Sequence, residues 1–169
     1  MIRFTEAGVG DIALLRDIAA TAWAPTYGHI LSPDQLEWMF EWMYSPDSLR
    51  RQLIDEGQRF FIASVDGEPC AYISVERQGE ALFHFQKIYV NPAYQGRGLG
   101  RALIEQGVAY IRSLGLKQFR VELNVNRANT AVGFYSRMGF AIAAEGDFPI
   151  GHGYYMNDYI MARDFDFTR

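Results

Sequence analysis

The sequence contains a single cysteine, Cys70, among its 169 residues. One thiol cannot form a disulfide within the chain, so the usual covalent support of secreted domains is excluded. Long apolar runs are missing too, since none approaches the roughly 20 residues that a membrane-spanning helix needs. The first residues, MIRFTEAGVGD, lack the basic and then apolar order of a secretion signal. We therefore expect a cytoplasmic protein that does not enter a membrane.

Basic runs interleaved with aromatic residues are absent, which argues against a nucleic-acid partner. The net charge is −4, but it is unevenly distributed. Residues 85–137 hold eight Lys and Arg against two Glu, a local charge of +6, which leaves −10 for the rest of the chain. This basic centre favours an anionic ligand, although scattered solvated charges would give the same count. We expect no metal site.

Hydrophobic residues make up 49% of the chain and aromatic residues 15%. A chain of this length and composition can bury the core of one ordinary domain. No linker, internal repeat or low-complexity stretch divides the sequence. We therefore expect one domain over residues 1–169.

Apolar periodicity, helix caps and turn residues predict the order of the secondary structure. Strands are predicted at residues 2–7, 59–65, 70–78, 81–90, 118–125, 140–146 and 154–165, and helices at 12–24, 32–44, 45–57, 98–115 and 129–138. Three pairs of consecutive strands are joined by short turns, but those at 81–90 and 118–125 are joined through a helix. This order predicts a mixed α/β fold with helices on the faces of the sheet.

The stretch VNPAYQGRGLGRAL, residues 90–103, places three glycines within five positions, between a strand and a helix. A helix start offers unpaired N–H groups and the positive end of the helix dipole, and glycines let a bulky anion approach them. Arg97 and Arg101 add positive charge. The loop therefore predicts a site for an anion such as a pyrophosphate, with a merely tight turn as the plainer alternative.

Two common phosphate-binding patterns do not match this loop. The dinucleotide-binding pattern G-x-G-x-x-G fails because position 101 is Arg. The P-loop pattern needs Gly-Lys followed by Ser or Thr, which is absent. The anion is therefore not identified by these patterns.

The loop instead resembles the acetyl-CoA-binding motif of the GNAT superfamily of N-acetyltransferases, Q/R-x-x-G-x-G/A, which here reads Gln95-Gly96-Arg97-Gly98-Leu99-Gly100. Downstream, NRANTAVGFYSRMGF resembles a second signature of that family, matched at Asn129, Phe134, Tyr135, Gly139 and Phe140. The order of predicted elements is similar to the family's along nearly the whole chain. The resemblance implies the family fold, a mostly antiparallel seven-stranded sheet that splays between strands 4 and 5.

The resemblance also implies acetyl-CoA as the cofactor, with coenzyme A as the product. Its pantetheine would pair with backbone groups of Ile88 and Val90, beside Tyr89, in the gap between the splayed strands. Asn129 and Tyr135 would contact the same arm. Its pyrophosphate would lie on the glycine loop, at Gln95, Gly96, Arg97, Gly98, Leu99, Gly100 and Arg101.

Transfer to an amine needs a polarised thioester, a proton for the departing thiolate and a neutral amine. By resemblance, the Val90 N–H polarises the thioester oxygen and Tyr135 donates the proton to sulfur. A ring packed in the core is the plainer interpretation of Tyr135. Cys70 is the only thiol for a covalent route, and its place on the middle strand of a hairpin indicates a core residue. Direct transfer is therefore favoured.

The base that neutralises the amine has more than one candidate. His84 lies six residues before Val90, and period two predicts that residues 84, 86, 88 and 90 share one strand face. A surface or hydrogen-bonded histidine is the plainer interpretation of His84. Glu122, on the facing strand, is the second candidate. A chain of waters in place of any one side chain is the third.

The acceptor is less constrained, because the family acetylates many kinds of amine. Residues 1–60 carry nine acidic and five basic side chains, which suits a cationic acceptor. The same segment is rich in aromatic rings that can bind cations, although much of it must be core. This region and the C-terminal GYYMNDYIM resemble the PaiA-type polyamine acetyltransferases. We therefore expect a small amine such as a polyamine, bound by Trp23, Tyr27, Tyr154 and Asp158.

Two other functions stay open from the sequence. A protein of this fold can bind acetyl-CoA as a sensor or an inactive partner, but the presence of Tyr135 argues against that. A plain interaction domain, built on the aromatic N-terminal helices, would have no affinity for coenzyme A. Dimerisation is common in the family, so a homodimer is a further expectation.

Overall fold

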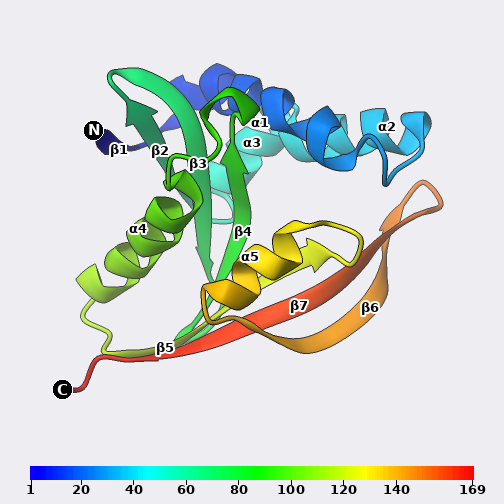
Figure 1. The fold of residues 1–169 in the computed structure, drawn as a ribbon. Coiled ribbons are helices and arrows are strands. Elements are labelled where there is room, and N and C mark those ends of the chain that lie inside the picture. The colour runs from blue at the N-terminus through cyan, green and yellow to red at the C-terminus, as the bar shows by residue number, and fades with distance from the viewer.

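Seven strands form one sheet in the order β1-β2-β3-β4-β5-β7-β6 in the computed structural model, which describes residues 1–169 (Figure 1). All neighbouring strands are antiparallel except β4 and β5, which run parallel. The strands are β1 (Ile2–Glu6), β2 (Arg59–Val65), β3 (Glu68–Arg77), β4 (Leu82–Val90), β5 (Gln118–Asn126), β6 (Ala141–Gly151) and β7 (Tyr154–Asp166).

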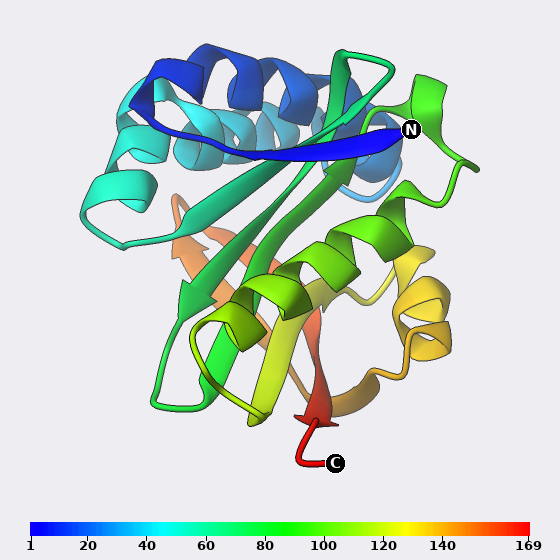
Figure 2. The ribbon, with the colours of Figure 1, turned by 90° about the vertical axis from the view of Figure 1, so that its left-hand side faces the viewer.

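Five helices cover the two faces of this sheet, and Figure 2 shows α4 on the opposite side of the strands from α1. The helices are α1 (Ile12–Tyr27), α2 (Pro33–Tyr44), α3 (Pro46–Ile54), α4 (Leu99–Ser113) and α5 (Ala131–Arg137). Short 3-10 turns at Val9–Asp11 and Pro92–Tyr94 precede α1 and α4. None of these helices is long and apolar enough to cross a membrane.

The core has two layers because both faces of the sheet are apolar and covered. One layer of 22 buried residues joins the sheet to α4 and α5, with Leu103 and Ile111 among its members. The other layer has 13 buried residues and joins the sheet to α1, α2 and α3, with Leu15 and Leu49 among its members. Burial on this scale is the main source of stability in such a fold.

Strand β4 contains a bulge that changes which side chains share a face. Ser74 pairs with Lys87 and Val75 pairs with Phe85, so Gln86 is an extra residue without a partner. Ile88 packs in the same core layer as Phe85, under α4. The prediction that residues 84, 86, 88 and 90 share one face is therefore wrong, because period two breaks at the bulge.

Strands β4 and β5 are paired over three positions only, ending at His84 with Glu122. Beyond this point β4 continues to Val90 and β5 to Asn126, but the two strands separate. The gap lies at the centre of the molecule, between α1 and α5 (Figure 1). The predicted fold class and the splay between strands 4 and 5 are confirmed.

The boundaries of several predicted elements differ from those observed; α3, for example, ends at Ile54, three residues before the predicted end. Helix α1 continues through Pro25 to Tyr27, three residues past the predicted end. A proline inside a helix removes one backbone hydrogen bond, and here the turn survives that loss. Strand β6 runs to Gly151, where Gly151, His152 and Gly153 all have positive φ and form the turn into β7.

Candidate functional site

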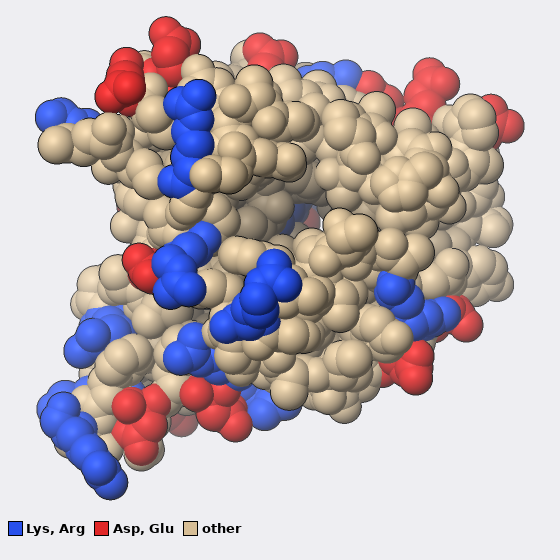
Figure 3. Space-filling model, viewed as in Figure 1, with Lys and Arg blue, Asp and Glu red and all other residues tan.

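A cleft of about 940 Å³ occupies the gap between β4 and β5. Its walls come from the C-terminal half of β4, the glycine loop, the end of β5 and α5. Figure 3 shows a hollow at the centre of this face, with Lys and Arg gathered on its α4 and α5 side. Arg101 and Arg137 line the cleft itself, so the cleft combines open space with positive charge.

The glycine loop presents free backbone amides to this cleft. Gly96 and Gly98 have φ of +80° and +78°, a left-handed conformation that favours glycine. Gly98 is the N-cap of α4 and no side chain caps the helix, so the N–H groups of its first turn stay unpaired. Gly100 has another role, because a Cβ there would lie 2.9 Å from Phe134 Cζ on α5.

The amide of Val90 also faces the cleft. Asn91 N donates to Cys70 O on β3 over 2.8 Å. Successive residues of a strand direct their backbone groups to opposite neighbours, so those of Val90 and Ile88 face β5. Because β5 has separated from β4 at this level, these groups are free to pair with an extended ligand.

Tyr135 lies across the cleft from β4, on α5. Its ring is 9% exposed and packs edge-on against Phe134 and Phe140. Burial raises the pKa of its phenol above the usual value, with a smaller contribution from Tyr27. The hydroxyl therefore carries its proton at neutral pH, and the raised pKa makes it a weaker acid than a free phenol.

A second cavity, of about 40 Å³, adjoins the cleft on the α1 and α2 side. We call it the acceptor pocket, after the residues predicted to bind the acceptor that line it. The lining residues are Trp23, Tyr27, Leu31, Met39, Met43, Tyr89, Asn124, Asn126, Tyr155, Met156 and Asp158. Tyr27, Tyr89 and Asn124 line the cleft as well, so the two cavities meet at these side chains. The pocket is mostly apolar, and Asp158 is its one carboxylate.

The hairpin between β6 and β7 is held against α2 beside this pocket. Gln35 Nε2 on α2 donates to Tyr155 O over 3.1 Å. The ring of Trp38 stacks on His152, with centroids 5.3 Å apart, and Tyr154 packs on both rings. Predicted acceptor residues Trp23, Tyr27 and Asp158 therefore meet in the pocket, whereas Tyr154 belongs to this hairpin contact outside it.

Most of the residues predicted for the cofactor line the cleft. These are Ile88, Tyr89, Val90, Gln95, Gly96, Gly98, Leu99, Gly100, Arg101, Asn129 and Tyr135. Arg97 is exposed outside it, with its guanidinium over the Tyr94 ring at 5.1 Å from the centroid. The second arginine of the cleft is Arg137, from the last turn of α5.

The two predicted bases lie elsewhere. His84 and Glu122 pair across β4 and β5 below the point where the strands separate, and neither lines the cleft or the pocket. Burial lowers the pKa of His84, against the opposing effect of Glu122. Phe83 and Phe85, on either side of His84, belong to the α4 layer together with Ile88. His84 therefore points to the opposite face of the sheet from Ile88.

Cys70 is fully buried on β3, and it does not line the cleft. Its sulfur lies 3.7 Å from Ala63 O, and burial raises the pKa of the thiol. A buried thiol of raised pKa is a poor nucleophile, which agrees with a core role.

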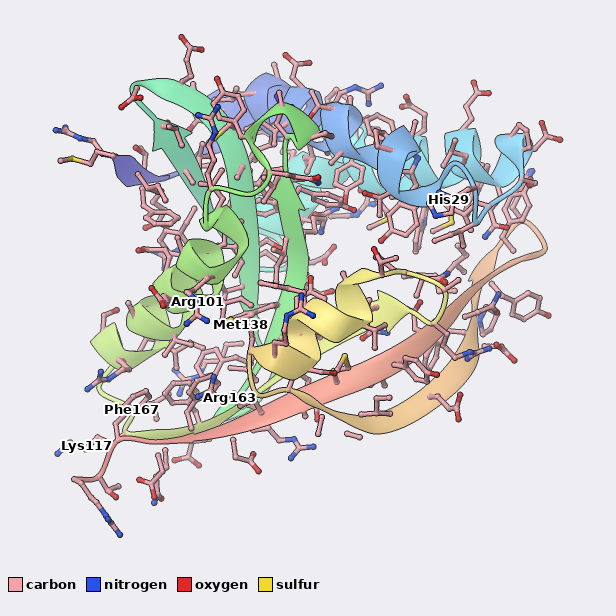
Figure 4. The ribbon with its side chains drawn as sticks, viewed as in Figure 1. His29, Arg101, Lys117, Met138, Arg163 and Phe167 are labelled. Carbon is pink, nitrogen blue, oxygen red and sulfur yellow. The ribbon has the colours of Figure 1, made fainter.

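Asn124 and His29 are among the polar residues of the cleft that sequence reasoning missed. Asn124 lies on β5 and its side chain bonds to β7, a contact that the sequence does not show. His29 comes from the connection between α1 and α2, opposite Arg101 in Figure 4. The cleft position of His29 depends on how α1 packs over the sheet.

A family model described as an acetyltransferase (GNAT) domain matches residues 29–148. An uncharacterised N-acetyltransferase of Methanocaldococcus jannaschii is 32% identical over 111 residues, which cover 61% of this chain and 44% of that protein. The chain thus spans less than half the length of that relative. One from Mycobacterium tuberculosis is 27% identical over 155 residues, covering 91% of this chain and 97% of that protein.

The fold is also similar to that of the PaiA N-acetyltransferase from Thermoplasma acidophilum, which was solved in complex with coenzyme A. The TM-score is 0.81, with 20% identity over 98% of this chain and 99% of that one. The family match covers well over half of the sequence, including the glycine loop and Tyr135. The chain therefore belongs to the acetyltransferase (GNAT) family.

Proposed function

We propose that the protein transfers the acetyl group of acetyl-CoA directly to a primary amine of a small cationic acceptor, such as a polyamine. The observation that carries this proposal is the meeting of two cavities at Tyr27, Tyr89 and Asn124. One cavity has the features of a coenzyme A site, and the other is narrow, aromatic and acidic.

The residues of the cleft suit coenzyme A. The free amides of the glycine loop and the first turn of α4 would hold a pyrophosphate, with Arg101 and Arg137 as counter-charges. The free backbone groups of Ile88 and Val90 would pair with the amides of a pantetheine arm. The PaiA fold relative was solved with this cofactor, which supports the same assignment here.

Bound acetyl-CoA supplies an activated acetyl group. The Val90 N–H would donate to the thioester oxygen, where negative charge develops during attack. Tyr135 would donate its proton to the sulfur, and burial keeps that proton on the phenol at neutral pH. Asn129, at the mouth of the cleft beside α5, would contact the pantetheine arm.

The acceptor pocket favours a slim cation. Its volume of about 40 Å³ admits an aliphatic ammonium group but no large ring system. Aromatic faces of Trp23, Tyr27 and Tyr89 and the Asp158 carboxylate all favour positive charge. Asp and Glu are gathered along the outer edge over α1–α3 (Figure 3), which would attract a cationic molecule.

The test is release of free coenzyme A from acetyl-CoA, followed as thiol, against a panel of amines. The panel contains ethylamine, putrescine, spermidine, spermine, an aromatic amine, an aminoglycoside and a short peptide. We expect turnover with the slim aliphatic amines and none with the aminoglycoside. Coenzyme A binding, measured by calorimetry, together with no release for any amine would reject the proposed reaction and favour a sensor.

A further inference from the structure

Asp158 on β7 is the one acidic side chain among the buried residues, at 2% exposure. Its Oδ2 accepts a hydrogen bond from Asn124 Nδ2 over 3.2 Å. No Lys, Arg or His forms an ion pair with it. The carboxylate therefore has one neutral partner, and Oδ1 has none within the protein.

A buried carboxylate without a cation is costly, and proteins usually supply a basic side chain or a metal ion. Arg127 is the one basic residue that lowers the pKa of Asp158, but its guanidinium bonds to Asp147 and faces Glu145 on β6. No group of three or more His, Cys, Asp and Glu could hold a metal here. The protein itself supplies no counter-charge, and a cation that enters the pocket would supply one.

The position of Asp158 decides which part of that molecule it meets. The pocket is small, at about 40 Å³, which is room for a few water-sized groups. It adjoins the cleft through Tyr27, Tyr89 and Asn124, and Asn124 is the residue that holds Asp158. An ammonium bound at Asp158 therefore lies next to the cleft, where the acetyl group is transferred, and is the reacting group.

We propose that Asp158 binds the reacting ammonium of the acceptor and removes its first proton. The inference rests on the proposed function of the site. The freed amine forms a C–N bond to the acetyl carbon as the C–S bond breaks. Tyr135 gives its proton to the departing sulfur, the second proton of the nitrogen replaces it on the phenolate by way of water, and the proton on Asp158 passes to solvent.

Among the titratable groups around the pocket, Asp158 is the one whose charge changes below neutral pH. Burial raises the pKa of Tyr27 to about 12 and that of Tyr89 well above the ordinary value. The paired Arg127 stays charged, and Tyr155 is a phenol at the rim. Met39 and Met43, which face the pocket from α2, do not titrate. Burial also raises the pKa of Asp158, toward the range of a useful base.

The experiment compares Asp158→Asn with wild type, using ethylamine and 2,2,2-trifluoroethylamine as acceptors across a range of pH. Trifluoroethylamine is largely neutral at pH 7 and needs no base, whereas ethylamine is an ammonium. For ethylamine at pH 7 we expect kcat/KM to fall by about 100-fold or more. The loss for trifluoroethylamine should be much smaller, and raising the pH should restore ethylamine turnover in the variant.

Asp164→Asn is the matched control, because it makes the same change on the same strand at a side chain that is 76% exposed. It should retain wild-type rates with both amines. An Asp158→Asn loss that is equal for both amines and independent of pH would overturn the inference, since a structural role predicts that pattern. The profile of kcat/KM against pH for ethylamine gives a further check. If its acidic limb moves in His29→Gln and not in Asp158→Asn, the inference is also overturned.

Ethylammonium binding separates this inference from the proposed reaction. Calorimetry at pH 7, with coenzyme A present, should detect binding to wild type and to Asp164→Asn but not to Asp158→Asn. Turnover by wild type without this difference would refute the role of Asp158 and leave the reaction standing. This binding test does not depend on turnover. If wild type fails to bind ethylammonium, the inference is refuted, whether or not any amine is acetylated.

Discussion

The hydroxyl of Tyr44 on α2 donates a hydrogen bond to the hydroxyl of Tyr89 on β4 over 2.6 Å, inside the core. Both rings are buried, and Tyr89 also lines the cleft and the acceptor pocket. The bond therefore ties α2 to the strand that we propose pairs with the cofactor. Its removal should affect both stability and the position of Tyr89.

Tyr44→Phe should lower the free energy of unfolding by about 1 kcal/mol, because Tyr89 loses a buried partner. Tyr72→Phe is the matched control: the Tyr72 ring lies 5.7 Å from that of Tyr89, and its buried hydroxyl has no protein partner. That variant should be neutral or more stable. Urea unfolding of both variants checks the difference, and equal losses would contradict the bond's role.

Gly98→Ala should weaken coenzyme A binding, because a side chain disfavours the left-handed conformation that aims the loop amides. The strain should also cost about 1–2 kcal/mol of stability. Gly115, just past α4, has φ of +90° and open space around it, as Gly98 does. Gly115→Ala should lose similar stability and keep its affinity for coenzyme A. If calorimetry finds the same affinity for coenzyme A in both variants, the glycine loop is not part of the coenzyme A site.

Tyr135→Phe should lower kcat by about 100-fold or more while the affinity for coenzyme A stays near the wild-type value. The phenol would donate the proton to sulfur, and its ring would still fill the same core position. Tyr110→Phe, on α4 and outside the cleft, is the control for loss of a phenol. Full activity of the Tyr135 variant would show that another group or a water protonates the thiolate.

The positions of the glycine loop and Tyr135 in the cleft could be predicted, because each depends on residues that are close in the sequence. The loop needs glycine at Gly96 and Gly98 for its backbone, and the chain order of strand, loop and helix fixes what it faces. Such local requirements produce a recognisable sequence motif. The splay between β4 and β5 followed from the same family resemblance and is observed.

The acceptor side could be predicted only in part, because it depends on contacts between distant segments. Trp23, Tyr27 and Asp158 were expected to bind the acceptor, but their meeting with Asn124 depends on α1, β5 and β7 packing together. His84 was misplaced on the face of Ile88 and Val90 because one extra residue, Gln86, shifts the register of β4. A bulge of this kind has no local signature in this sequence.

Lys87 follows that bulge and is 6% exposed, with its ammonium over the Phe60 ring and 3.4 Å from Gln58 Oε1. Burial lowers the pKa of Lys87 from 10.5 to about 8, partly offset by Glu56 and Glu76. Between these two pH values the unfolded chain holds a proton that the folded chain has released. The contribution of Lys87 to stability should therefore rise as pH increases through this window.

Lys87→Met should remove this dependence on pH. Relative to the variant, wild type should gain up to roughly 3 kcal/mol in unfolding free energy over the window, and about a third of it between pH 8 and 9. Urea unfolding at pH 7.5, 8.5 and 9.5 measures the difference. Lys117→Met changes the other lysine of the chain, which is exposed, and should follow wild type at each pH. A wild-type curve parallel to that of Lys87→Met would mean that the ammonium of Lys87 remains hydrated in the folded protein.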